Sequence, residues 1–221
     1  MPKGPTLSNA VTMRETDPLK DLGLDLGVKQ NAKLQDFSKV LLQWNKRTNL
    51  ISRRDERRVF PRHILDSLAA TSFLVGKNVV DIGSGAGLPG IPLAIACPHK
   101  NFTLCDRMKK RAHFMRFVIA NLGIENAQVI EAPFEEIGLM GESFDCVVSR
   151  GVGRAEALWP IVESAITKTG RLIVYASTQS CEDELMSKLA GKVPQGGLQI
   201  LNAAVEIPGL NKSHRFHIID K

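Results

Sequence analysis

The stretch that most constrains this chain is VVDIGSGAGLPG, residues 79–90, in which four glycines follow a short β-branched run. The glycines are Gly83, Gly85, Gly87 and Gly90. Glycine at this density costs backbone entropy and is typical of a turn that approaches a ligand closely. A strand followed by such a turn predicts a nucleotide- or nucleoside-binding loop at the carboxyl end of a parallel sheet.

The glycine spacing distinguishes several kinds of loop. No lysine follows the glycines, so the pattern G-x-x-x-x-G-K-[ST] of nucleoside triphosphatases is absent. The dinucleotide pattern G-x-G-x-x-G fails from Gly83, because residue 88 is leucine, but it matches from Gly85. The alternative pattern D-x-G-x-G-x-G begins at Asp81 and places a carboxylate at the end of the strand. A carboxylate there suits a cation and disfavours a pyrophosphate, which favours a methyltransferase that uses S-adenosylmethionine. A nucleotide-dependent oxidoreductase and a tight turn without a ligand are the alternatives.

Three residues are expected to contact this cofactor, which carries a sulfonium and an ammonium group. Asp81 is expected to orient its amino-acid end, directly or through water, while Gly85 lets the backbone approach the nucleoside. Asp106 ends the next apolar run, FTLCD, and is expected to accept hydrogen bonds from the ribose hydroxyls. The same acid serves nicotinamide enzymes, so it does not separate the two classes.

Alternating strand and helix patterns after residue 77 predict an α/β fold of the class I (Rossmann-like) methyltransferase type. The expected sheet is mostly parallel and seven-stranded, with an antiparallel C-terminal strand formed by a hairpin. Strands are expected at 78–82, 102–105, 127–130, 144–149, 171–176, 198–207 and 214–219. Helices are expected at 29–46, 57–74, 89–97, 109–122, 155–168 and 181–190.

The chain divides into three predicted parts. Residues 1–28 are expected to be a flexible N-terminal segment, residues 29–76 a basic helical cap, and residues 77–221 the S-adenosylmethionine-binding methyltransferase domain. The net charge is +6, and residues 1–76 hold 13 Lys and Arg against 8 Asp and Glu, a net of +5. This concentration of charge favours a polyanionic partner, although a solvated helix face would also explain it.

Composition favours a soluble cytoplasmic protein. The sequence contains no run of about 18 apolar residues, so no membrane span is predicted. The first residues lack the apolar core of a signal peptide. The four cysteines, Cys97, Cys105, Cys146 and Cys181, have no metal-binding spacing and are read as reduced core thiols.

Five segments, in order, resemble the bacterial ribosomal RNA small subunit methyltransferase G family, also called glucose-inhibited division protein B. They are LLQWNKRTNLIS (41–52), RHILDSL (62–68), DIGSGAGLPGIPLAI (81–95), TLCDRMKKRAHFMR (103–116) and VVSRGVG (147–153). The resemblance implies a cytoplasmic enzyme that methylates N7 of guanine 527, in the 530 loop of 16S rRNA, with S-adenosylmethionine. Its partner would be naked 16S rRNA, the 30S subunit or an assembly intermediate. We expect a monomer that needs neither a metal nor a membrane.

The resemblance also implies cofactor-binding residues. They are Gly83 and Leu88 in the glycine loop, Phe134 and Glu135 in the segment that flanks the adenine, and Arg150 after the fourth strand. Arg150 is expected to hold the cofactor or to orient the guanine. The alternative for Arg150 is a structural salt bridge to Asp145 or Glu163.

No catalytic acid or base is expected. The N-P-P-Y clamp of exocyclic-amine methyltransferases is absent, since that place reads SRGVG. Guanine N7 carries a free lone pair at neutral pH, so methylation needs only alignment with the methyl–sulfur bond.

The N-terminal helices carry further candidates. The polar residues Asn45, Asn49, His63 and Asp66 either shape the substrate entrance or form a hydrogen-bonded helix junction, and Trp44 is expected in the core. The predicted RNA footprint consists of phosphate-contacting residues. These are Arg53, Arg54, Arg57, Arg58, Lys109, Lys110 and Arg111.

One departure from the family concerns a lysine common after the fifth strand, where this chain reads YASTQS (175–180). Arg154 or Lys168 are the candidates to replace it. Two other function classes stay open: a small-molecule methyltransferase of the same fold, and a non-catalytic RNA-binding protein.

Overall fold

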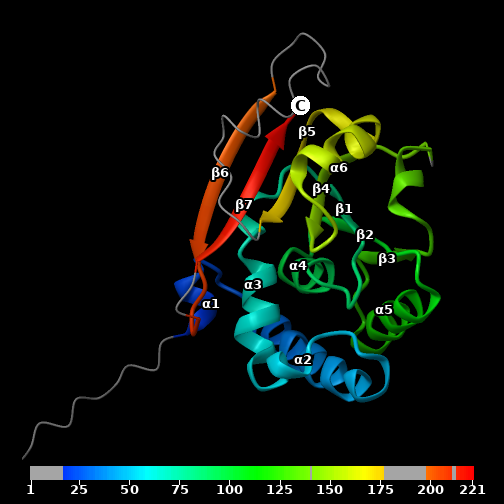
Figure 1. Cartoon of the computed structure of the whole chain (residues 1–221). Coiled ribbons are helices and arrows are strands. Elements are labelled where there is room, and N and C mark those ends of the chain that lie inside the picture. The colour runs from blue at the N-terminus through cyan, green and yellow to red at the C-terminus, as the bar shows by residue number, and fades with distance from the viewer. Residues whose placement is uncertain (1–16, 140, 177–197, 211–212) are drawn as a thin grey trace, which may run out of the picture.

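The strands after residue 77 form one seven-stranded sheet in the order β3-β2-β1-β4-β5-β7-β6 (Figure 1). A computed structural model describes residues 17–139, 141–176, 198–210 and 213–221. The strands are β1 (Asn78–Ile82), β2 (Asn101–Cys105), β3 (Ala127–Ile130), β4 (Phe144–Arg150), β5 (Ile166–Ala176), β6 (Gln199–Glu206) and β7 (Ser213–Asp220).

The direction of each strand confirms the predicted fold class. Strands β1 to β5 pair in parallel, whereas β7 is antiparallel to both β5 and β6. The carboxyl ends of the parallel strands therefore share one edge of the sheet. Because β7 is reversed, its first residues lie at that same edge, with Arg215 opposite Ala176 and His217 opposite Val174.

The helices match the sequence predictions in part. The α-helices are α1 (Pro18–Asp21), α2 (Val28–Thr48), α3 (Asp66–Leu68), α4 (Gly90–Ala96), α5 (Lys109–Leu122) and α6 (Ala155–Val162). The 3-10 segments are η1 (Arg53–Arg58), η3 (Thr71–Phe73), η4 (Phe134–Leu139) and η5 (Glu163–Ala165), and η2 (Phe60–Leu65) is π-helical.

Two predicted helices are wrong in extent. The expected helix over 57–74 is a series of short helical segments, η1 to η3 with α3 between them. The expected helix over 155–168 ends at Val162, and β5 begins at Ile166, which pairs with Phe144. A β-branched pair, Ile166 and Thr167, favours the strand over a longer helix. The expected helix over 181–190 lies outside the described residues.

Alternate residues of each strand face two core layers. In β1, Val79 packs into the layer covered by α2, α4 and α5, and Val80 into the layer covered by α6. Figure 1 shows α2 and α5 together below the sheet and α6 above it. Cys97, Cys105 and Cys146 are free and buried in these layers, as predicted. Cys181 lies outside the described residues.

The N-terminal segment contributes to the core from Asp17 onward. The Asp17 carboxylate accepts a hydrogen bond from the Leu19 N–H at 3.0 Å, and Leu19 is 6% exposed. The predicted flexible segment 1–28 thus contains a packed turn of helix within its described part, and the division into three domains stays a prediction. Over the described ranges, no helix has the length and apolarity to cross a membrane.

Candidate active site

The glycine loop connects β1 to α4 at the carboxyl edge of the sheet. The Gly90 N–H donates to Asp81 Oδ2 at 2.9 Å, which fixes the start of α4 against the end of β1. A Cβ at Gly90 would lie 2.1 Å from Leu104 Cδ2, so this glycine is required for packing. Leu88, within this loop, is buried in the same core layer as Leu104.

A side chain at Gly85 would point into open space. The φ of Gly85 is +57°, and a Cβ there would meet no atom closer than the Gly83 carbonyl oxygen at 3.8 Å. Its N–H donates to Asp106 Oδ2 at 2.9 Å. The loop thus leaves open space beside the carboxylate at the end of β2, as a bound nucleoside requires.

Asp81 is fully buried, at 0% exposure. Burial raises the pKa of its carboxyl to about 7, while the Gly90 N–H acts in the opposite direction. Oδ2 serves Gly90, and Oδ1 has no hydrogen-bond partner among the described residues. The atom left for a cationic ligand group is therefore Oδ1.

Asp106 lies where a ribose is expected, but both of its oxygens already accept hydrogen bonds. Oδ1 accepts from the Met108 N–H at 2.8 Å, and Oδ2 from Gly85. Arg111 adds an ion pair with Oδ2 at 3.5 Å. A ribose hydroxyl would share these oxygens. Beyond β3, Phe134 is half-buried and Glu135 is exposed, at the beginning of η4.

Arg150 makes a salt bridge, but with neither of the expected partners. Its Nη1 lies 2.8 Å from Asp66 Oδ2, which brings the end of β4 to α3. Asp145 instead accepts hydrogen bonds from the Lys77 and Asn78 N–H groups. The predictions of a pair with Asp145 or Glu163 are wrong, since sequence spacing gave no sign of a partner 84 residues away.

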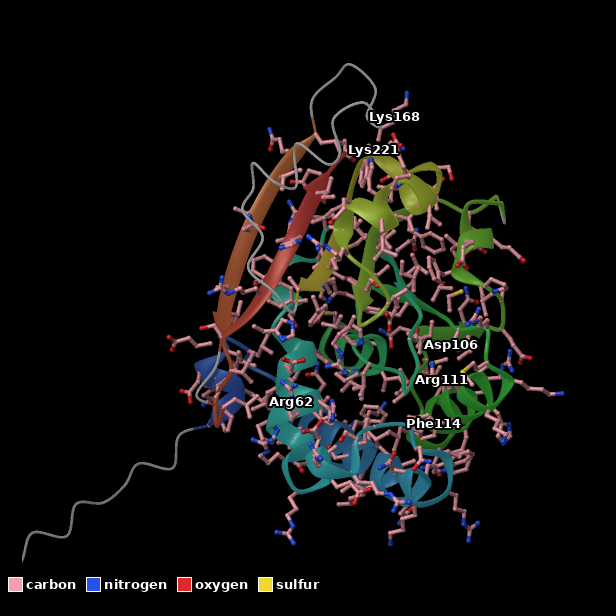
Figure 2. The ribbon with its side chains drawn as sticks, viewed as in Figure 1. Arg62, Asp106, Arg111, Phe114, Lys168 and Lys221 are labelled. Carbon is pink, nitrogen blue, oxygen red and sulfur yellow. The ribbon has the colours of Figure 1, made fainter. Side chains whose placement is uncertain are left out.

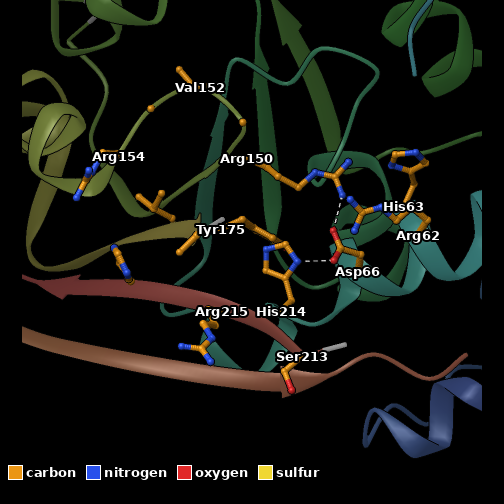
Figure 3. A pocket seen from close by; sticks show the side chains of 15 residues that line it. Arg62, His63, Asp66, Arg150, Val152, Arg154, Tyr175, Ser213, His214 and Arg215 are labelled. Atoms are coloured by element: carbon orange, nitrogen blue, oxygen red, sulfur yellow. Dashed lines mark hydrogen bonds and ion pairs between the residues drawn. The ribbon is translucent and has the colours of Figure 1, made fainter. Parts of the chain in front are cut away.

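A cavity of about 830 Å³ opens beside Arg150 (Figure 3). Its walls come from η2 and α3, from the ends of β4 and β5, and from the start of β7. Cationic or titratable side chains dominate the lining: Arg62, Arg150, Arg154, Arg215, His63, His214 and His217. Asp66 is the one carboxylate among the described residues that line it.

Asp66 joins two walls of this cavity. Arg150 pairs with Oδ2, and His214 Nδ1 hydrogen-bonds Oδ1 (Figure 3). Burial acts to raise the pKa of Asp66, but hydrogen bonds and charge from His214 and Arg150 outweigh it and hold the pKa below its usual value. Burial and Arg150 lower the pKa of His63 to about 4, so this imidazole is neutral at physiological pH.

Tyr175 supports the same wall. Its hydroxyl donates to the Ser67 carbonyl oxygen, and its ring meets His214 edge-on with centroids 5.1 Å apart. Sequence reasoning missed both Tyr175 and His214. His214 is 148 residues from Asp66, and no spacing pattern joins them.

The N-terminal polar residues divide between two roles. Asn45 is a junction residue, because its side chain donates to Glu56 and accepts from the Ile51 N–H. Asn49 ends α2 with a left-handed φ of 47°. His63 and Asp66 instead line the cavity.

Trp44 is half-buried and packs against the core, so its predicted place in the core is confirmed in part. Its ring lies against those of His113, Phe114 and Phe117 on α5.

The predicted RNA footprint is drawn from two elements, η1 and α5. Arg53, Arg54, Arg57 and Arg58 are exposed on η1, and Lys109 and Lys110 are exposed at the start of α5. Of the two candidates for the missing lysine, Arg154 lines the cavity. Lys168 lies at the opposite edge of the sheet, far from Asp106 and Arg62 (Figure 2).

Comparison with known proteins joins this site to a family. Residues 30–195, which include the glycine loop, Asp66 and Arg150, match the family model described as rRNA small subunit methyltransferase G. The chain belongs to the rRNA small subunit methyltransferase G family. Curated methyltransferase G relatives include the protein of Shewanella woodyi, 34% identical over 92% of this chain and 96% of that one. Another, from Alteromonas mediterranea, is 36% identical over 76% of this chain and 78% of that one.

The fold of this methyltransferase G chain also occurs in solved structures of low sequence identity. The plantazolicin methyltransferase BpumL in complex with SAH superposes with a TM-score of 0.57 at 14% identity. The match covers 88% of this chain and 99% of that one. At this identity the likeness shows the class I methyltransferase fold alone.

Proposed function

We propose that this protein methylates N7 of a guanine in small-subunit ribosomal RNA, guanine 527 in the 530 loop of 16S rRNA, with S-adenosylmethionine. The family match over residues 30–195 carries this proposal. The relatives are named as small-subunit rRNA methyltransferases, and the open glycine loop supplies a place for the cofactor.

The proposed cofactor residues surround that loop. They are Asp81, Gly83, Gly85, Leu88, Asp106, Phe134 and Glu135. Arg150, which the family resemblance also implies, is proposed to orient the guanine instead. Three observations fit the group: the open space above Gly85, the carboxylate of Asp106 beside it, and the buried Oδ1 of Asp81 with no partner in the described chain. Leu88 packs into the core beside the loop's glycines, so its proposed effect on the cofactor acts through packing.

Methylation of guanine N7 needs no proton transfer from an acid or to a base. When bound, S-adenosylmethionine supplies a methyl group on a positively charged sulfur, and the guanine N7 lone pair displaces that sulfur. The protein's own part is to align the base and to exclude competing orientations. In well-oriented reactions such alignment lowers the activation barrier by about 7–11 kcal/mol. We therefore assign no catalytic acid or base.

The RNA partner is proposed to lie over η1 and the start of α5. Arg53, Arg54, Arg57 and Arg58 are exposed and would contact phosphates. Arg111 pairs with Asp106, so its contribution to RNA binding is smaller than that of Lys109 and Lys110. Since the substrate is ribosomal, we place the protein in the cytoplasm, and we propose separately that it is a monomer.

The deciding experiment maps N7-methylguanine in 16S rRNA from cells with and without this gene, by borohydride reduction and aniline cleavage. Cleavage at guanine 527 only when the gene is present is the expected result. Cleavage that persists without the gene would contradict the proposal. Methylation of free guanosine by the purified protein would instead support a small-molecule methyltransferase, and failure to bind S-adenosylmethionine in calorimetry would support a non-catalytic RNA-binding protein.

A further inference from the structure

We propose that the cavity between α3, β4, β5 and β7 receives the acceptor guanine, and that Asp66 is the positioning residue that sets Arg150 toward its O6 edge. This inference rests on the proposed function, because it names the place of the base in the same reaction. The base would enter turned out of the RNA, as enzymes that modify bases require.

The cavity lies next to the proposed cofactor loop. A Cβ at Gly83 would lie 2.3 Å from Val152 Cγ2, and Val152 also lines the cavity. The side chain of Val152 thus lies between the glycine loop and the cavity. The volume, about 830 Å³, is in the range of sites for small organic ligands, about 300–1,000 Å³.

The lining suits a guanine nucleotide. Arginine is the residue that most often contacts the O6 and N7 edge of guanine, whereas adenine presents an amino group at position 6. Asp66 occupies one terminal nitrogen of Arg150, Nη1, and the guanidinium carries five N–H donors in all. A hydrogen bond from Arg150 to O6 would leave N7 free for the methyl group and would reject adenine.

The charge of the product explains why Arg150 needs a carboxylate partner. Methyl transfer forms the N7–C bond while the C–S bond breaks and its electrons stay on sulfur, so the positive charge moves onto the guanine ring. An uncompensated arginine beside that ring would oppose the reaction. Asp66 is 4% exposed and lies 2.8 Å from Arg150, so it offsets this charge while holding the guanidinium in place.

His214 fixes the other oxygen of the same carboxylate. Its hydrogen bond to Oδ1 and the ion pair of Arg150 with Oδ2 hold Asp66 from two walls. Tyr175 packs on His214 and is anchored to Ser67 next to Asp66, so the carboxylate has little freedom to turn. These contacts make the position of Arg150 depend on Asp66.

The test compares two carboxylate variants on two substrates. Asp66→Asn keeps the shape and removes the charge. Asp55→Asn is the matched control, since Asp55 pairs with Arg62 of the cavity wall but does not itself line the cavity. The substrates are 16S rRNA, naked and in the 30S subunit, with either guanine or 2,6-diaminopurine at the target position. Diaminopurine keeps N7 but carries an amino group in place of O6.

For the wild type we expect kcat/KM to be at least 100-fold higher for guanine than for diaminopurine. Asp66→Asn should lose at least 100-fold in kcat on guanine, with less than threefold change in the KM for RNA and in the Kd for S-adenosylmethionine. Its preference for guanine should fall below tenfold. Asp55→Asn should keep the wild-type preference.

If Asp66 had a purely structural role, Asp66→Asn would lower kcat/KM equally on the guanine and the diaminopurine RNA. The preference for guanine would then be unchanged, and that result would overturn the inference. A wild type without preference would overturn it too, while the proposed function would stand. A wild type that methylates neither RNA would instead overturn the proposed function, and this inference with it.

A second measurement works without variants. Target RNA with 6-thioguanine at the methylated position is cross-linked to the full-length wild-type protein by near-ultraviolet light. We expect cross-linked peptides from α3, the end of β4 or the start of β7. Cross-links confined to α5 or η1 would overturn the placement of the base.

Discussion

At the residue scale, the charge on Asp81 lowers the stability of the fold but suits the binding of a cationic ligand. It pins the start of α4 through Gly90, yet it does so as a fully buried acid with a pKa of about 7. Around neutral pH the folded protein therefore holds a carboxylate that burial disfavours. A cationic ligand group at Oδ1 would relieve that cost.

Asp81→Asn tests this conflict. The folded-state pKa exceeds the unfolded value of 3.8, so the acid's contribution to stability is full below pH 3.8 and is lost as pH rises through about 7. At pH 8 the cofactor-free variant should be more stable than the wild type, by at most about 4 kcal/mol, and the gain should vanish near pH 4. Urea unfolding at both pH values measures this difference. Equal stability changes at both pH values would contradict it, and calorimetry should show weaker binding of S-adenosylmethionine.

For His63 we expect the opposite dependence of the unfolding free energy on pH. Its folded-state pKa of about 4 lies below the usual 6.5, so stability is lost as pH falls from 6.5 toward 4. His63→Gln should remove up to about 3 kcal/mol of this loss. Urea unfolding from pH 7 to pH 4 is the measurement, and His99→Gln, at an exposed histidine, is the control. An identical pH slope in wild type and His63→Gln would show that the burial of this imidazole has no effect on stability.

At the scale of elements, the loop between β1 and α4 combines glycines needed for packing with one needed for access. Gly90 lies against Leu104, while Gly85 faces open space. The sequence predicted the loop and its acidic neighbours well, because strand and glycine patterns are local. It failed for the helix over 57–74, which breaks into short segments where Asp66 and Ser67 pack against distant strands.

Gly85→Ala and Gly123→Ala form a matched pair. Both glycines have a φ of +57° and no close atom at the position of a Cβ, but Gly123 ends α5 away from the loop. Each variant should lose about 1–2 kcal/mol of stability from the left-handed backbone. Only Gly85→Ala should weaken S-adenosylmethionine binding, by at least tenfold in calorimetry. Similar affinities for the two variants would place the cofactor elsewhere.

At the scale of the whole molecule, the arginines expected to bind RNA and the cavity proposed for the target base lie on the same side of the protein. η1 contacts η2, where Arg62 lines the cavity, so the footprint adjoins the cavity proposed for the base. Lys168 lies at the other edge of the sheet (Figure 2). Lys168 therefore lies outside the proposed footprint.

Replacing Arg53, Arg54, Arg57 and Arg58 with glutamine should reduce the salt dependence of RNA binding. Each lost phosphate contact lowers the slope of log K against log salt by about 0.7 on single-stranded RNA, so the slope should fall by about 3. Filter binding at several salt concentrations measures it, with Lys168→Gln as the control. A slope unchanged by the four substitutions would remove η1 from the footprint.

The amino-acid sequence by itself determined the α/β alternation, the glycine loop with Asp81 and Asp106, and the family. These features depend on periodicity and on residues close together in the chain. Only the tertiary structure decided that Arg150 meets Asp66 and that His214 holds the same carboxylate. For His214 the physical reason is the reversal of β7, which places the start of that strand beside the end of β5 and brings residues 148 positions apart to one cavity.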